Sequence, residues 1–151
     1  TLDYEIGLAG SYMTIQKIRL EDRRLFHVEC PEQLGKALIL PLTIQPLLEN
    51  AIRYGMEEMM DTCEISIRTM KEGGLLIVEV SNEGSVFEDG LLEKLQDGTK
   101  NAHGFGIGLV NIHQRIQMLF GEAYGLSFKN ENEKAIAIIT IPYKTEEDDY
   151  A

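Results

Sequence analysis

A carboxylate and an amide stand side by side at Glu49 and Asn50, inside a segment with helical periodicity. An amide oxygen can ligate a hard cation such as Mg²⁺, and a carboxylate can accept a proton from an attacking nucleophile. This pair is therefore suited to a site that holds magnesium and ATP. The ordinary alternative is a solvated polar face, because Arg53 and Tyr54 also lie off the apolar side of the same segment. Spacing alone favours that alternative.

A glycine-rich run, Gly104-Phe105-Gly106-Ile107-Gly108-Leu109, precedes a second amphipathic segment. Glycine permits close backbone approach, and free amides at a helix start can bind an anion. The run is not a dinucleotide-binding fingerprint, because Leu109 stands where the last glycine is required and no strand precedes it at the start of a βαβ unit. It is not a P-loop either, because no Lys and Ser or Thr follow Gly108. Taken alone, the run predicts either a phosphate site or a plain flexible turn.

Three helices are predicted from apolar residues at helical spacing. The clearest covers 43–55, with Pro46 in its first turn and Gly55 as its C-terminal cap. Its apolar stripe consists of Ile44, Leu47, Leu48, Ala51 and Ile52. The other two cover 2–20 and 107–120, the last ending at Gly121.

Strand-like segments alternate with these helices. They cover 24–30, 63–70 and 75–82 joined by a turn at 71–74, and 124–129 and 135–143 joined around 130–133. The polar stretch from 83 to 103, with at most a short helix at 89–96, is typical of a functional lid. The order predicts an α+β fold, a two-layer α/β sandwich in which helices pack on one face of a mixed sheet.

Composition limits the class of protein. At 151 residues and 44% hydrophobic content, the chain fits one globular domain. Its 14 Lys and Arg against 25 Asp and Glu give a net charge of −11, which predicts no nucleic-acid partner and no direct membrane contact. A nucleotide site would need backbone amides, a few placed cations or a divalent metal. Cys30 and Cys63 show no CxxC spacing, so buried thiols are expected rather than a disulfide or a metal pair.

Two motifs taken together resemble one family. Residues 42–55 are similar to the N box of the LytS/YesM-type bacterial sensor histidine kinases. The glycine-rich run, continued by Val110-Asn111-Ile112, Arg115 and Gly121, looks like their G2 box and the helix after it. Residues 12–19 resemble the end of the family's helical linker. The joint match covers nearly the whole chain and is far more specific than either motif.

The resemblance implies a Bergerat (GHKL, HATPase_c) ATP-binding fold, shared with gyrase, Hsp90 and MutL. It would make Asn50 the ligand of a magnesium ion that bridges the phosphates of ATP. Glu49 would be the catalytic residue that activates the phosphoacceptor histidine, as a base or hydrogen-bond partner. Arg53 would lie near the phosphates and Tyr54 beside the adenine or ribose.

The same resemblance assigns the rest of the cofactor site. Gly104, Gly106 and Gly108, with Phe105, Ile107 and Leu109 between and after them, would let the lid close and offer amides to the phosphates. The family's G1 box usually holds an aspartate and two glycines, whereas this chain has Asn82, Gly84 and Val86. The amide oxygen of Asn82 can accept a hydrogen bond from the adenine amino group. It lacks the negative charge of a carboxylate, which implies weaker adenine binding. Lys100 is a candidate phosphate contact, with a solvated role as the alternative.

The phosphoacceptor is expected outside this chain, because none of His27, His103 and His113 lies in a segment resembling the acceptor box. We expect His27 on a strand, His113 on a helix surface and His103 in the lid. The expected organisation is a helical linker at 1–22, the ATP-binding domain at 23–144 and an acidic tail at 145–151.

The predicted function is that of a protein-histidine kinase domain with ATP and Mg as cofactors. It would transfer the γ-phosphoryl group to a histidine on upstream dimerisation helices, for a cognate response regulator. The parent would be a homodimeric, integral plasma-membrane protein with this domain in the cytoplasm. One alternative is a nucleotide-sensing or docking module with weak or no kinase activity. Another is a repair or chaperone ATPase, but those carry extra transducer domains and no such linker.

Overall fold

The computed structural model of the 151-residue chain describes residues 1–19, 24–58, 63–83 and 105–146. The elements are α1 (Leu2–Arg19), β1 (Arg24–Glu29), the short 3₁₀ helix η1 (Glu32–Leu34), α2 (Ile44–Glu58), β2 (Cys63–Glu72), β3 (Leu75–Glu83), α4 (Phe105–Phe120), β4 (Gly125–Glu131) and β5 (Lys134–Pro142). The predicted α+β fold is confirmed. The expected short helix at 89–96, the lid around it and most of the acidic tail lie outside the described residues.

The strands form one mixed sheet in the order β1-β2-β3-β5-β4. β1 pairs in parallel with β2, and the connection between them carries α2. The other neighbours pair antiparallel, as two hairpins joined side by side through β3 and β5. In the middle of the sheet, the end of β3 at Glu83 therefore lies beside the start of β5 at Lys134.

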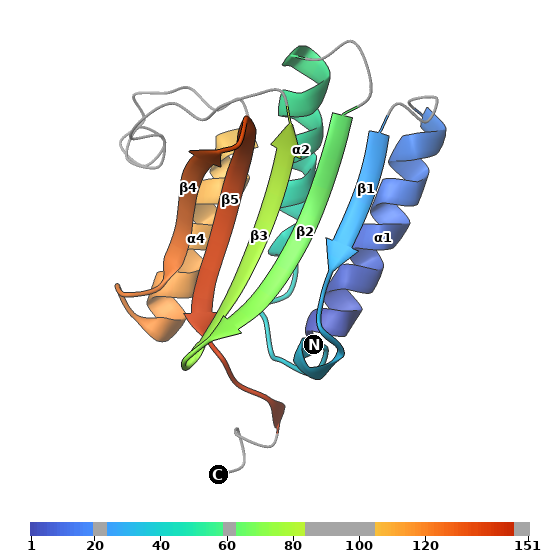
Figure 1. Ribbon diagram of the computed structural model, residues 1–151. Helices are drawn as coiled ribbons and strands as arrows, with labels where there is room; N and C mark the ends of the chain where they lie inside the picture. The colour runs from blue at the N-terminus through green and yellow to red at the C-terminus, as the bar shows by residue number, and fades with distance from the viewer. Residues whose placement is uncertain (20–23, 59–62, 84–104, 147–151) are drawn as a thin grey trace.

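The helices lie together on one face of the sheet (Figure 1). Alternate residues of β3 point toward them, and Leu76, Val78 and Val80 are almost completely buried. The predicted stripe of α2 packs on this layer, together with a stripe from α4. The buried hydrophobic residues of the two helices are Ile44, Leu47, Leu48, Ala51, Ile52, Leu109, Ile112 and Ile116. The packing of the core thus determines which sides of α2 and α4 face away from the sheet.

Several predicted boundaries were wrong. Gly55 does not cap α2, which continues to Glu58. A glycine inside a helix costs only about 1 kcal/mol, and Met and Glu, which follow it here, are good helix formers. The hairpin turns are also tighter than predicted, because the strands extend to two-residue turns at Gly73-Gly74 and at Asn132-Glu133. Asn132 and Glu133 have φ of 52° and 64°, as a type I′ turn requires.

His113 was predicted on a helix surface and is instead buried, with 8% of its surface exposed. Its Nδ1 accepts the backbone N–H of Leu126 at 3.0 Å, which ties α4 to the start of β4. Gly125 has a φ of +151°, and a Cβ placed there would lie 2.6 Å from the imidazole ring. The close approach of β4 to α4 therefore requires glycine at this position. His27 lies on β1 as predicted, and His103 falls outside the described residues.

Cys30 is a free, partly buried thiol at the end of β1. Its Sγ lies 3.7 Å from the carbonyl oxygen of Pro31. The side chain of Cys63 lies outside the described part of the structure. Within that part, no helix has the length and apolar character needed to cross a bilayer.

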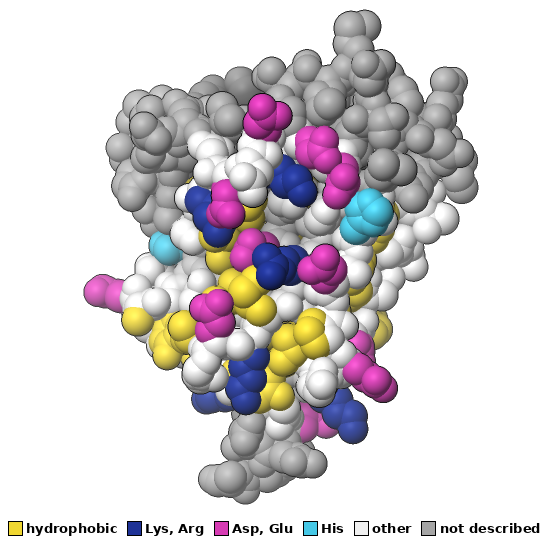
Figure 2. Space-filling model, viewed as in Figure 1, with side chains coloured by type: hydrophobic (Ala, Val, Ile, Leu, Met, Phe, Trp, Pro, Cys, Tyr) yellow, Lys and Arg dark blue, Asp and Glu magenta, His cyan; other side chains and the backbone are white. Residues whose placement is uncertain are grey.

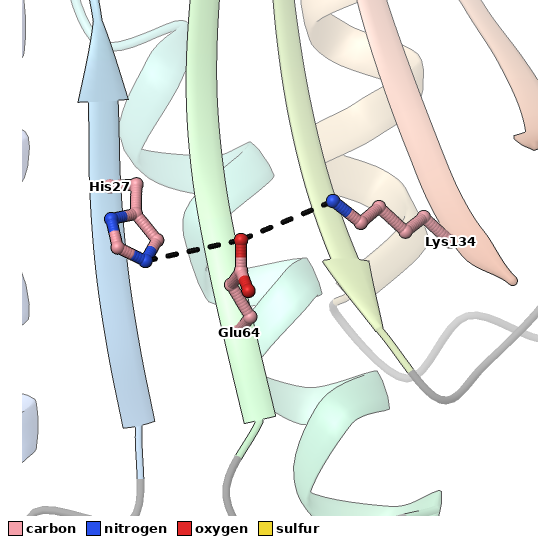
Figure 3. A network of polar contacts seen from close by, with 3 residues as sticks. All are labelled: His27, Glu64 and Lys134. Carbon is pink, nitrogen blue, oxygen red and sulfur yellow. Dashed lines mark ion pairs between the residues drawn. The ribbon is translucent and has the colours of Figure 1, made fainter. Parts of the chain in front are cut away.

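The sheet face opposite the helices carries charged side chains of both signs (Figure 2). A shallow hollow of about 660 Å³ runs across it. Glu64 lies between His27 and Lys134 (Figure 3). Its Oε1 is 3.9 Å from Nε2 of His27 and 4.0 Å from Nζ of Lys134.

The pKa of Glu83, at the end of β3, is raised from its ordinary value. The main cause is burial, and a hydrogen bond with Glu64 and repulsion between the two carboxylates add to it. Partly exposed ion pairs such as those of Glu64 contribute little to the stability of the fold.

Replacing Gly125 by Ala is expected to lower the free energy of unfolding by about 2 kcal/mol, because the new methyl group meets the buried His113 ring and the φ is strained. Urea denaturation checks this. Gly10→Ala is the control, because Gly10 lies in α1 with open space beside it and the same change should stabilise by up to about 1 kcal/mol. Equal stability of Gly125→Ala and the unmodified chain would contradict the packing described for β4.

Candidate nucleotide-binding site

Asn50 carries a buried polar atom that lacks a partner. It lies in the middle of α2 with 2% of its surface exposed. Its Oδ1 makes no hydrogen bond within the part of the chain that the structure describes. An unpaired buried acceptor costs roughly 1–3 kcal/mol. An atom of this kind calls for an explanation, and an absent ligand is one of the few available.

Glu49 points the other way. Successive helix residues are rotated by about 100°, so Asn50 faces the interior while Glu49 is exposed. The Nε2 of Gln45 donates to the Glu49 carboxylate at 3.3 Å. Arg53 and Tyr54 follow on the next turn of α2, but their side chains lie outside the described part of the structure. The helix thus presents an amide oxygen inward and a carboxylate outward from adjacent positions.

The start of α4 lies close to α2. A Cβ built on Gly108 would lie 3.9 Å from the Cβ of Pro46, which is ordinary van der Waals contact. Further along α4, the Nη2 of Arg115 donates to the carbonyl oxygen of Pro41 at 3.0 Å. The two helices therefore run in opposite directions, as Figure 1 also shows. Since both rise about 1.5 Å per residue, Asn50 is level with the first residues of α4.

The glycine-rich run lies differently from its prediction. α4 begins at Phe105, two residues earlier than expected, so Gly106 and Gly108 belong to its first turn. The first four amides of a helix have no partner within it, and the positive end of the helix dipole lies there. A phosphate group can therefore bind at this helix start. The side chains of Phe105 and Ile107 lie outside the described part of the structure.

Leu109 was predicted among the nucleotide-binding residues, and the structure places its side chain in the hydrophobic core. It is 1% exposed and belongs to the hydrophobic core. Its amide also comes after the first turn of α4, where helix hydrogen bonds begin. Leu109 therefore anchors the first part of α4 in the core.

Asn82 lies on the same side of the sheet as Asn50. It is 1% exposed and follows the helix-facing parity of Val78 and Val80 along β3. Its Nδ2 donates to the carbonyl oxygen of Glu83 at 3.3 Å. The end of β3, the C-terminal half of α2 and the start of α4 lie at the same end of the sandwich (Figure 1). The other predicted residues, Gly84, Val86, Lys100 and Gly104, lie outside the described residues.

The turn before α2 contains a contact that the sequence reasoning missed. Leu42 has a φ of +59°, a left-handed conformation that costs a residue other than glycine roughly 1–3 kcal/mol. Its backbone N–H donates to Oε1 of Glu5, a buried carboxylate on α1, at 3.2 Å. Leu2, Glu5, Ala9 and Met13 are all buried at helical spacing. A glutamate on this apolar stripe was the signal that could have identified the contact.

The comparison with protein families identifies the family of the chain. Residues 35–145 match the family described as "Histidine kinase-, DNA gyrase B-, and HSP90-like ATPase". The chain belongs to this family.

Among sequences, the chain is similar to sensor histidine kinases. It is 39% identical to YesM of Bacillus subtilis over 147 residues, which cover 97% of this chain and 24% of that protein. It is 29% identical to BtsS of Escherichia coli over 147 residues, with the same coverage, and 28% identical to LytS of Streptococcus agalactiae over 153 residues, 99% of this chain and 26% of that protein. The chain thus spans about a quarter of the length of these curated relatives.

Solved structures show the same fold. A nucleotide-free catalytic domain of histidine kinase ThkA aligns with a TM-score of 0.69 at 20% identity, over 93% of this chain and 95% of that one. ThkA in complex with the response regulator TrrA aligns with a TM-score of 0.64 at 18% identity, over 91% of this chain and 39% of that one. The chain is therefore an ATPase-family domain of the kind found in sensor histidine kinases of the YesM and LytS type.

Replacing Asn50 by Leu is expected to raise the free energy of unfolding by about 1 kcal/mol, because a similar volume is kept and an unpaired buried oxygen is removed. Denaturation in urea without nucleotide measures this. The control is Thr43→Val, which also removes a buried polar group but breaks the bond from its hydroxyl to the carbonyl oxygen of Leu40, and should destabilise. A clear loss of stability in Asn50→Leu would contradict the stability cost assigned to the unpaired Oδ1.

Proposed function

We propose that this chain is the ATP-binding catalytic domain of a sensor histidine kinase, which binds Mg·ATP and transfers the γ-phosphoryl group to a histidine outside the chain. One observation carries the proposal. The buried, unpartnered Oδ1 of Asn50 lies level with the free amides at the start of α4. A hard cation accepts an amide oxygen, and a helix start accepts phosphate, so the two features fit a metal-bound triphosphate.

Each residue would act through its position. Asn50 would hold Mg²⁺, which neutralises negative charge on the phosphates. Gly106 and Gly108 would let the triphosphate approach the α4 amides, with Gly104 before them. These local groups would offset the repulsion expected from a net charge of −11.

Glu49 would interact with the phosphoacceptor histidine. Its carboxylate is exposed on α2, so an imidazole presented from outside the chain can reach it. By accepting the proton of one ring nitrogen, the carboxylate would make the other nitrogen a better nucleophile toward the γ-phosphorus. Arg53 would contact the phosphates, and Tyr54 and Asn82 would line the adenine and ribose. Gly84, Val86, Phe105, Ile107 and Lys100 complete the proposed site.

The rest of the parent protein would supply the other functions. Residues 1–22 would form the linker from the dimerisation helices, 23–144 the catalytic domain and 145–151 a tail. The parent would be a membrane-anchored homodimer with this domain in the cytoplasm, and it would act on a cognate response regulator. The relatives' names as sensor histidine kinases and the ThkA–TrrA complex support this view. A nucleotide-sensing module without kinase activity is the second candidate, because Asn82 provides no carboxylate for adenine.

Calorimetric titration with ATP, with and without Mg²⁺, tests the proposal. Asn50→Ala should weaken binding at least tenfold in the presence of Mg²⁺ and much less in its absence, because a metal ligand is removed. Asn130→Ala, an exposed amide on β4, is the matched control and should bind as the unmodified chain does.

Glu49→Gln separates the two candidates. If the chain is a kinase, this variant should keep nucleotide affinity within about threefold and lose most phosphotransfer to an added acceptor helix, because Gln cannot accept the proton. If the unmodified chain binds Mg·ATP but transfers no phosphate to any such helix, the sensing module is the better description. Absence of binding at millimolar ATP would contradict both.

A further inference from the structure

Three helices meet at the turn formed by residues 40–43, directly before α2. From α1, Oε1 of Glu5 accepts the N–H of Leu42 at 3.2 Å. From α4, Nη2 of Arg115 donates to the carbonyl oxygen of Pro41 at 3.0 Å. Within the turn, the hydroxyl of Thr43 donates to the carbonyl oxygen of Leu40 at 3.0 Å, and Thr43 is completely buried. The start of α2 is therefore set by side chains from both neighbouring helices.

Glu5 is the buried carboxylate among these contacts. A carboxylate is rarely buried without a role, and Glu5 is only 5% exposed. It bonds a residue whose conformation needs support, since Leu42 has a left-handed φ and a side chain that is 58% exposed. Packing of the Leu42 side chain thus does not explain its backbone conformation. The bond from its amide to Glu5 does.

The N-terminal half of α1 is held firmly to the same region. The N–H of Leu2 donates to the carbonyl oxygen of Ala37 at 2.8 Å, and that of Asp3 to Gly35 at 2.9 Å. The buried side chains of Leu2, Ala9 and Met13 join the core beside α2. A displacement of α1 is therefore passed to residues 35–42 through bonds rather than absorbed by a loose loop.

We propose that Glu5 is a positioning residue for the nucleotide site, through which the placement of α1 sets the placement of Asn50. Thr43 and Asn50 are separated by two turns of α2, and an α-helix transmits a shift of its first turn with little loss. Arg115 joins α4 to the same turn, so the amides at the α4 start move with Asn50. This inference rests on the proposed function of the site and adds a route by which α1 controls it.

The test compares the gain in ATP affinity that Mg²⁺ produces, because that gain reports the metal ligand rather than general stability. Glu5→Ala should reduce the gain about tenfold, the size expected when support of a metal ligand is lost. Glu5→Gln keeps an oxygen that can accept from Leu42 and should retain the gain within about threefold. Adding Leu42→Gly to Glu5→Ala should restore most of the gain, because glycine adopts a φ of +59° without strain.

Met13→Ala is the matched control for stability. It removes a buried side chain from the same helix, so it should unfold at lower urea yet keep the magnesium-linked gain. Hydrogen exchange provides a readout without nucleotide, and exchange at Leu42 and in the first turn of α2 should be faster in Glu5→Ala than in Met13→Ala.

The outcomes are distinct. The positioning role would be overturned if Glu5→Ala kept the full gain in ATP affinity from Mg²⁺, or if Met13→Ala reduced that gain equally. Either result would leave the nucleotide site in place. Failure of the unmodified chain to bind Mg·ATP would overturn the proposed function, and the inference with it.

Discussion

A buried amide oxygen without a hydrogen-bond partner is the constraint on which this structure depends. Asn50 occupies a position on α2 that the core could fill with an aliphatic side chain, and its neighbours Leu47, Leu48 and Ala51 are aliphatic and buried. An unpaired acceptor there weakens the folded state unless something binds it. Retaining a polar group at a stability cost is typical of functional sites. In the proposed function, this oxygen is the ligand that the fold offers to the metal ion.

The residues around Asn50 determine how α2 and α4 are placed relative to each other. Pro46 and Gly108 let the first turns of α2 and α4 approach closely, which brings the unpaired amides of α4 level with Asn50. The turn at residues 40–43, held by Glu5 and Arg115, fixes where α2 begins. An acidic chain that binds a triphosphate needs favourable charge concentrated at one place. Helix amides and a metal ligand would provide it without changing the overall charge.

Much of the fold could be predicted because the helices and strands have strong hydrophobic periods. Predictions failed where a local signal competed with tertiary structure. Gly55 looked like a cap but lies within a helix, and His113 looked exposed but bonds the backbone of β4. The assignment of positions 49 and 50 to a nucleotide site stays a prediction. The place of Glu5 on an apolar stripe indicates that it is buried, but not that it bonds Leu42, which lies 37 positions away.

A crystal structure of the chain with Mg²⁺ and a non-hydrolysable ATP analogue would test the central claim most directly. The account predicts that Oδ1 of Asn50 lies about 2.1 Å from the metal, the usual distance for magnesium and oxygen. It also predicts that the phosphates contact the amides at the start of α4. A nucleotide bound with its metal away from Asn50, or bound on the open face of the sheet, would contradict the account.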